Sequence, residues 1–284
     1  MDKKNRLIVF GLIALVAVSI ASLSGFMVTE QSVETVSSGP PKAVIIDQLS
    51  EEFPNEFFYK KAVEYLETAG YKVDIVTTKD ITVDYYKNLP EKNYKMVIVR
   101  THGADNTEGN NVVLFTGEKY QDDKYIQEQL FGQVTKAAPL LEVAYKPADE
   151  SESNWVIVND TYSYLKSSVK KETSAENEFF AISPKLVSDS MKGKFDDTVF
   201  ILGGCNTLSN PSMATSLFKR GASAVIGWDN KVGSTDNDNA ILYFLQLHLT
   251  QDFDIEKSVD ILRDAMNPQL MPFPANFTHY QNLV

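Results

Sequence analysis

Continuous apolar runs alternate with helix-spaced segments along most of this chain, and this alternation limits its fold more than any other feature. The runs are short and rich in β-branched residues, which predicts strands at residues 42–47, 71–78, 94–103, 197–204 and 222–228. Helices are predicted at residues 56–70, 211–221, 236–249 and 254–266, with a short helix ending before Pro90. Apolar strands that alternate with helices indicate an α/β fold, in which helices cover both faces of a mostly parallel sheet.

The segment between Ala104 and Phe195 departs from this alternation. Four features are expected there: a hairpin around Gly117, a helix at 124–135, a strand at 154–160, and a strand followed by a helix at 179–193. Two charged, polar stretches, 146–154 and 170–178, predict solvated loops. The tail after Asn267 carries three prolines and predicts irregular structure.

The N-terminus carries a signal for export from the cytoplasm. Residues 7–28 contain no charge and are long enough to span a bilayer as a helix. Three cations precede this segment: Lys3, Lys4 and Arg6. The positive-inside rule then predicts a membrane anchor with the rest of the chain outside the cytoplasm, and a cleaved signal peptide with a secreted product is the alternative. Residues 29–41 predict a polar linker, which leaves residues 42–284 as the folded domain.

The charge of the chain argues against nucleic acid as a partner. The 284 residues carry a net charge of -11, and no Lys/Arg-rich tract follows the first six residues. The three histidines and the single cysteine lack the spacing of a metal site. We therefore expect neither a metal nor a cofactor.

The single cysteine, Cys205, follows one predicted apolar strand after two glycines, and His102 ends another. Sites in open α/β sheets form outside the carboxyl ends of the strands, so these two side chains are expected at one edge of the sheet. If the strands are neighbours, the imidazole can take the thiol proton and activate the sulfur as a nucleophile. The backbone N–H groups of Gly103 and Cys205 could then donate to one oxyanion. A lone cysteine that only fills the core is the alternative.

The motifs that carry this pair resemble those of the caspase-like, or clan CD, cysteine peptidases. That family shows an apolar strand ending in His-Gly, here MVIVRTHG, and a later strand ending in small residues and cysteine, here VFILGGCNT. The stretch beyond Cys205, including GASAVIGW, looks most like the CHAT-domain and gingipain members. The resemblance covers about residues 42–270 and implies a caspase-like three-layer αβα sandwich. It implies a cysteine endopeptidase in which Cys205 is the nucleophile, His102 is the general base or acid, and an acyl-enzyme forms.

The sequence departs from the family pattern in the spacing of the pair. His102 and Cys205 are 103 positions apart, whereas family members commonly place them closer. We therefore interpret about residues 104–178 as an insertion, which would serve as a lid, a specificity subdomain or an activation segment to be cut.

The resemblance also implies a pocket for the residue before the scissile bond, which in many members selects a basic residue with a carboxylate. Asp47 ends the first predicted strand, and Asp229 follows Trp228 after the strand at 222–228. Either carboxylate could bind Arg or Lys through a charge-assisted hydrogen bond, and Trp228 could wall the pocket. The alternatives are that Asp47 caps a turn, that Asp229 starts a loop, and that Trp228 packs at a strand end.

The function expected from these observations is peptide-bond hydrolysis on a protein or peptide substrate, by a domain held outside the cytoplasm. A transpeptidase or transamidase is an alternative with the same chemistry, in which an amine replaces water at the acyl-enzyme. A catalytically silent binding or scaffold module on this fold is an alternative of another class. A flavodoxin-like ligand-binding domain is a third, although no phosphate-binding glycine loop follows the first strand.

Overall fold

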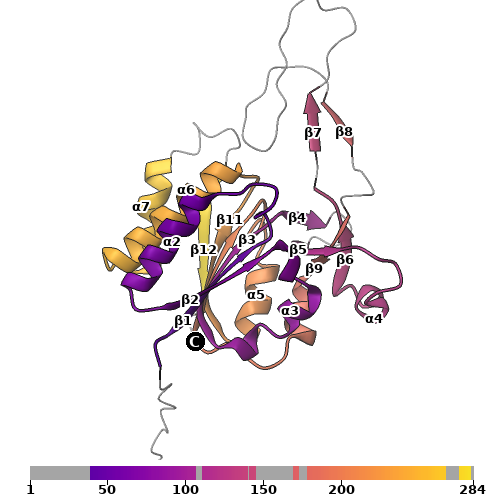
Figure 1. The fold of residues 1–284 in the computed structure, drawn as a ribbon, viewed down its shortest axis with the longest axis horizontal. Helices are drawn as coiled ribbons and strands as arrows, with labels where there is room; N and C mark the ends of the chain where they lie inside the picture. Colours follow the sequence, from indigo (N-terminus) through magenta and orange to yellow (C-terminus); the bar gives the residue numbers. More distant parts are fainter. Residues whose placement is uncertain are drawn as a thin grey trace, which may run out of the picture. The chain divides into compact units, whose positions relative to one another are not determined.

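The computed structural model of the chain describes residues 39–106, 111–139, 141–144, 169–172, 178–266 and 275–282 (Figure 1). From Pro40 onward these residues belong to one compact unit. The apolar segment 7–28, most of the linker, the expected loop at 146–154 and the expected strand at 154–160 lie outside the described residues. Among the described residues, no helix combines the length and apolar character needed to cross a membrane.

A six-stranded, mostly parallel sheet lies at the centre of the fold (Figure 1). Its strands, in spatial order, are β12 (Phe277–Gln281), β11 (Ala222–Trp228), β10 (Thr198–Gly203), β3 (Tyr94–Arg100), β1 (Lys42–Asp47) and β2 (Lys72–Thr77). All neighbours pair in parallel except β12, which runs antiparallel to β11. The five strands predicted from the apolar runs are confirmed, and β3 and β10 are direct neighbours.

The apolar runs are continuous because helices cover both faces of the sheet. In β1, Ala43 and Ile45 pack into one core, and Val44 and Ile46 pack into the other. The first core is closed by α2 (Glu56–Thr68), α6 (Ser234–Leu245), the short η5 (Gln246–Thr250) and α7 (Ile255–Met266). The second is closed by α3 (Val83–Lys87), the short η4 (Leu186–Ser190) and α5 (Ser212–Lys219). Two single-turn helices, η1 (Thr78–Asp80) and η2 (Pro90–Lys92), lie before and after α3 in the connection from β2 to β3.

A second, antiparallel sheet begins directly after β3. Its strands, in spatial order, are β4 (Gly103–Asn106), β5 (Asn111–Lys119), β9 (Phe179–Ile182) and β6 (Val134–Ala137). The short helix α4 (Ile126–Leu130) precedes β6, and a two-stranded ribbon joins β7 (Leu141–Ala144) to β8 (Val169–Glu172) (Figure 1). The segment interpreted as an insertion, about 104–178, lies within this part of the chain.

Four expectations from local sequence were wrong. Gly117 does not turn a hairpin, because β5 continues through it to Lys119 with an irregular register. The helix expected at 124–135 is limited to α4, because Gly132 takes a positive φ and β6 follows. The first residues of the loop expected at 170–178 belong to β8. The tail is not wholly irregular, because β12 pairs with β11 and buries Phe277 against Trp228.

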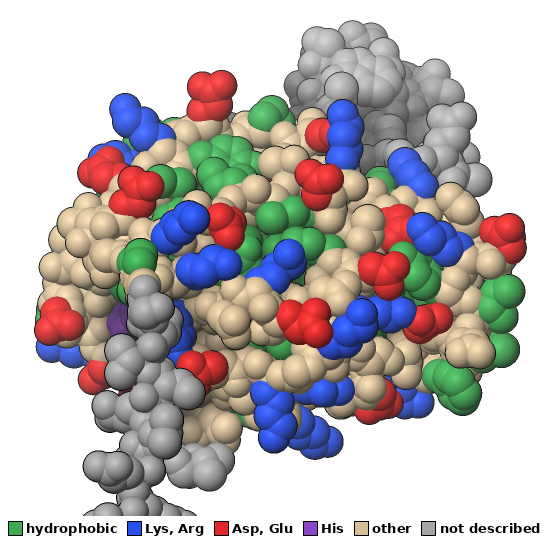
Figure 2. Space-filling view, turned by 60° about the horizontal axis from the view of Figure 1, so that its bottom comes forward, with side chains coloured by type: hydrophobic (Ala, Val, Ile, Leu, Met, Phe, Trp, Pro, Cys, Tyr) green, Lys and Arg blue, Asp and Glu red, His purple; other side chains and the backbone are tan. Residues whose placement is uncertain are grey.

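Charged side chains of both signs are interspersed over the face of the molecule in Figure 2. Lys and Arg alternate there with Asp and Glu, and apolar side chains are scattered between them. Several Lys and Arg side chains lie together at the bottom of this view.

Candidate active site

His102 lies just beyond the carboxyl end of β3. Its backbone N–H donates to the Gln48 side-chain oxygen at 3.0 Å, and its carbonyl accepts the N–H of Phe115 at 3.1 Å. The imidazole lies near the rings of Phe53 and Phe115 and is only 13% exposed. The histidine is therefore held by the loop after β1 on one side and by β5 on the other.

Glu52 is the direct partner of this imidazole. Its Oε2 lies 2.9 Å from Nε2 of His102. An ionised carboxylate only accepts hydrogen bonds, so with an ionised Glu52 this contact favours the tautomer of His102 that carries its proton on Nε2. Glu52 is not among the site residues expected from the sequence. It lies in the loop after β1, which leaves the same edge of the sheet as His102.

Cys205 lies two residues beyond β10 and is half-buried. Its Sγ is 3.4 Å from the backbone nitrogen of Val232 and 3.4 Å from the carbonyl oxygen of the same residue. The N–H group favours a thiolate, while the carbonyl accepts the proton of a thiol. The loop that follows β11 therefore contacts the sulfur in a way that suits both of its protonation states.

Two glycines bring the histidine and cysteine segments into backbone contact. A Cβ on Gly103 would lie 2.3 Å from the carbonyl oxygen of Cys205, and a Cβ on Gly204 would lie 2.2 Å from the carbonyl oxygen of Thr101. The N–H of Thr101 also donates to the carbonyl of Gly203 at 2.8 Å. Because real Cβ atoms do not approach other atoms so closely, only glycine permits this packing. The structure thus brings the His102 and Cys205 segments together at one edge of the sheet.

Thr207 ties the cysteine segment to the neighbouring strand β11. Its hydroxyl oxygen accepts the N–H of Trp228 at 3.1 Å and lies 2.8 Å from the carbonyl of Leu202, to which it donates. The side chain of Trp228 is fully buried, and its Nε1–H donates to Asn237 on α6. Trp228 therefore presents no exposed surface that would wall a pocket in this structure.

The two acidic residues considered for substrate binding already have protein partners. Asp229 is half-buried and accepts both the backbone N–H and the side-chain amide of Asn276, at 2.7 and 2.8 Å. Asp47 is fully buried and accepts Nη1 of Arg100 on both of its oxygens at 3.0 Å. Of the two carboxylates, only Asp229 is partly exposed to solvent.

The charged groups at this edge are buried together: burial raises the pKa of Asp47 above its usual range, while Arg100 and the Tyr59 hydroxyl oppose that rise. Burial would lower the pKa of Arg100, but the carboxylates of Asp238 and Asp47 outweigh it and raise that pKa. Burial and the nearby Asp47 carboxylate raise the pKa of Tyr59, so its hydroxyl remains a hydrogen-bond donor to Asp47. The side of the site behind β1 and β3 is therefore a fixed polar cluster.

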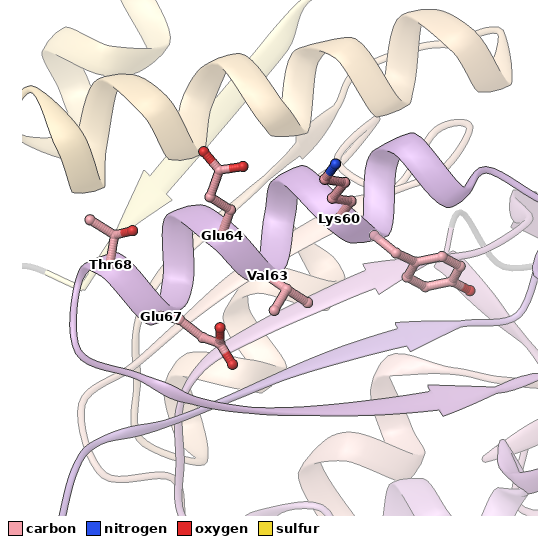
Figure 3. A pocket seen from close by; sticks show the side chains of 6 residues that line it. Lys60, Val63, Glu64, Glu67 and Thr68 are labelled. Carbon is pink, nitrogen blue, oxygen red and sulfur yellow. The ribbon is translucent and has the colours of Figure 1, made fainter.

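A surface hollow of about 480 Å³ runs along α2 (Figure 3). It is lined by Tyr59, Lys60, Val63, Glu64, Glu67 and Thr68, all of them α2 residues. Neither His102 nor Cys205 contributes to it. Within the part of the chain that the structure describes, no cluster of His, Cys, Asp and Glu side chains could hold a metal ion.

A comparison of this chain with protein-family models and with curated proteins found no match.

Proposed function

We propose that this chain is a cysteine endopeptidase of the caspase-like kind, in which Cys205 is the nucleophile and His102 the general base. The observation that carries the proposal is the backbone contact between the His102–Gly103 and Gly204–Cys205 segments at the carboxyl edge of β3 and β10. A nucleophile and its base must lie within hydrogen-bond reach of each other, and the close packing of these two adjacent strand ends supports such an approach.

In the proposed reaction, Nδ1 of His102 takes the proton of the Cys205 thiol, and Sγ attacks the carbonyl carbon of the scissile peptide bond. The tetrahedral intermediate collapses as the imidazolium gives its proton to the departing amine, which leaves a thioester acyl-enzyme. Water, deprotonated by His102, then attacks the thioester and releases the acid and the thiol. Glu52 stabilises the imidazolium formed in both halves of the reaction.

The backbone N–H groups of Gly103 and Cys205 are the proposed oxyanion donors. The Phe115 N–H donates to the His102 carbonyl, so the next pair in this ladder, Gly103 and Leu114, is of the non-hydrogen-bonded type. The Gly103 N–H then points away from β5, on the side open to the cysteine segment. Donors placed in this way typically contribute about 3–4 kcal/mol to stabilising the transition state.

The finer aspects of the fold and the location of the chain belong to the same proposal. The order β11-β10-β3-β1-β2, with helices on both faces, supports a caspase-like αβα sandwich. The apolar segment 7–28 supports export, with a membrane anchor favoured over a cleaved signal peptide. A preference for a basic residue before the cut would fall to Asp229, since Asp47 is buried against Arg100.

The test is covalent labelling of the full-length chain with a peptidyl acyloxymethyl ketone, which alkylates activated cysteines. Because Cys205 is the single cysteine, any thiol adduct reports on one site. We expect labelling of the wild-type chain, none of Cys205→Ala, and at least a hundredfold slower labelling of His102→Ala, since general base catalysis contributes about 10²–10⁴ in rate. His279→Gln, a partly exposed histidine on β12, is the matched control and should label normally.

Equal labelling of His102→Ala and wild type would overturn the catalytic pair. A labelled chain should also cleave members of a peptide library that varies the residue before the scissile bond. Absence of labelling and of cleavage under reducing conditions would favour the silent binding module instead.

A further inference from the structure

A buried cluster of three charges lies behind the proposed active site. Arg100 is 1% exposed, and its carboxylate partners Asp47 and Asp238 are 0% and 4% exposed. Buried ion clusters are weak contributors to stability, because the loss of hydration offsets most of the attraction. A role in fixing the conformation of nearby residues would account for this cluster better than a gain in stability.

The guanidinium of Arg100 makes five hydrogen-bond contacts through its three nitrogens. Four bonds go to carboxylates: Nε and Nη2 donate to Asp238 at 2.6 and 3.0 Å, and Nη1 donates to both oxygens of Asp47. The fifth, from Nη2, goes to the backbone carbonyl of Phe53 at 2.7 Å. The two carboxylates thus orient the guanidinium so that Nη2 also reaches the carbonyl of Phe53, the residue next to Glu52.

Each member of the cluster holds one residue of the loop between β1 and α2. Asp47 accepts the N–H of Leu49 at 2.9 Å, Arg100 binds the carbonyl of Phe53, and Asp238 accepts the side-chain amide of Asn55 at 2.8 Å. The loop has little other regular structure, and it carries Glu52.

The Glu52–His102 contact needs this support. The Glu52 side chain is 40% exposed, and an exposed pair of this kind gains little when both partners are free to move. With the backbone of the loop fixed, the contact has only to overcome the rotamer entropy of one glutamate side chain.

We propose that Arg100, oriented by Asp47 and Asp238, is a positioning residue that fixes the loop at residues 48–55 so that Glu52 selects the Nε2–H tautomer of His102. The catalytic meaning of that tautomer rests on the function proposed above. The physical coupling between Arg100 and the Glu52–His102 contact does not.

The test measures the tautomer of His102 in the full-length chain labelled with ¹⁵N-histidine. Ring-nitrogen chemical shifts report which nitrogen carries the proton, and His102→Gln assigns the signal among the three histidines. The wild type, Arg100→Lys, Glu52→Gln and the double variant are compared. A lysine ammonium lacks the planar fork that reaches both carboxylates and the Phe53 carbonyl at once. A glutamine amide can either accept or donate, so it does not select a tautomer.

We expect the Nε2–H tautomer to predominate in the wild type. Arg100→Lys and Glu52→Gln should each raise the ratio of Nδ1–H to Nε2–H at least about fivefold, the effect of losing one hydrogen bond of ordinary net strength. In the Glu52→Gln background, Arg100→Lys should change the ratio by less than about twofold, because both substitutions act through one contact. A wild-type ratio in Arg100→Lys, or an equal effect in both backgrounds, would overturn the proposal.

Arg220→Lys is the matched control. Arg220 also binds backbone carbonyls with its guanidinium, those of Val187, Ser188 and Gly193, but it lies in a loop remote from His102. This variant should keep the wild-type tautomer.

If Arg100→Lys does not fold, Asn55→Ser takes its place. Serine retains an oxygen for the N–H of Phe58 at the start of α2 but is too short to reach Asp238. We expect a smaller rise of the same ratio that disappears in the Glu52→Gln background, and an unchanged ratio would overturn the proposal.

The two proposals fail in different ways. Suppose that Arg100→Lys changes the His102 tautomer ratio through Glu52, but that the chain is never labelled at Cys205. This result would support the role of Arg100 and refute the peptidase. Histidine-dependent labelling with no tautomer coupling would support the peptidase and refute the role of Arg100.

Discussion

At the scale of single residues, the proposed site depends on two glycines, because they carry no Cβ atom. Gly103 and Gly204 each pack against a carbonyl of the opposite segment, where any side chain would collide. The backbones of the two segments can therefore approach within van der Waals contact. The two glycines thus allow the close approach that the proposed roles of His102 and Cys205 require.

Gly103→Ala tests this closeness. The added methyl would lie 2.3 Å from the Cys205 carbonyl, so one of the two segments must move. We expect a loss of about 1–3 kcal/mol in the free energy of unfolding, in line with overpacked sites, and labelling of Cys205 slowed at least about tenfold. Denaturant unfolding and the labelling rate are the measurements.

Gly39→Ala is the control, because a Cβ there meets no atom within 4 Å. Wild-type labelling of the Gly103→Ala chain would show that the close approach of the segments is not needed for the reactivity of Cys205.

At the scale of elements, the C-terminal strand β12 holds the loop that contacts the cysteine. Phe277 is buried and lies against Trp228 at a ring distance of 5.0 Å. Just before it, Asn276 binds Asp229, the first residue of the loop after β11. The strand thus fixes the chain that leads to Val232 and to its contact with Cys205.

Phe277→Ala tests how much β12 contributes to the free energy of unfolding, separately from the reactivity of Cys205. Removal of a buried aromatic side chain typically costs about 3–5 kcal/mol, and we expect about 3 kcal/mol at this edge strand. The measurement is denaturant unfolding of the full-length chain, with the labelling rate recorded on the folded fraction. Tyr280→Ala, on the exposed side of the same strand, should change the free energy of unfolding by less than about 0.5 kcal/mol. Similar losses in the two variants would argue against a specific role for Phe277.

At the scale of the whole molecule, the second sheet starts next to His102, the histidine of the proposed site. Gly103 is the first residue of β4, so the residues that separate His102 from Cys205 in sequence begin and end beside the site. This arrangement explains how a spacing of 103 residues remains compatible with neighbouring strands. Residues inserted in the sequence between β3 and β10 therefore need not move the carboxyl ends of these strands.

Export of the chain is the prediction at this scale. We expect the full-length chain to stay with the membrane after alkaline extraction, and its residues beyond 41 to be digested by protease added outside the cell. Replacing Lys3, Lys4 and Arg6 with Glu should reduce that exposure, because the positive flank sets the orientation. A soluble mature chain that begins near residue 28 would indicate the signal peptide, and a chain protected inside the cell would refute export.

The sequence by itself determined the central sheet and the position of His102 and Cys205 at its carboxyl edge. Continuous apolar runs identify strands buried on both faces, and the residues that follow such strands necessarily reach the carboxyl edge. His102 and Cys205 could be recognised in this way because their placement depends only on where each strand ends.

Only the tertiary structure decided the partners of these residues. Glu52 reaches His102, and Arg100 reaches Phe53 and Asp238, across long stretches of sequence that no local pattern connects. Asp47 ends the first strand as expected, yet its carboxylate is buried against Arg100 rather than open to a ligand. Strand β12 likewise forms because β11 offers it an edge, and the three prolines from which irregular structure was predicted all precede it. Periodicity reports which faces of an element are buried, but the choice among polar partners is made only when separate elements pack together.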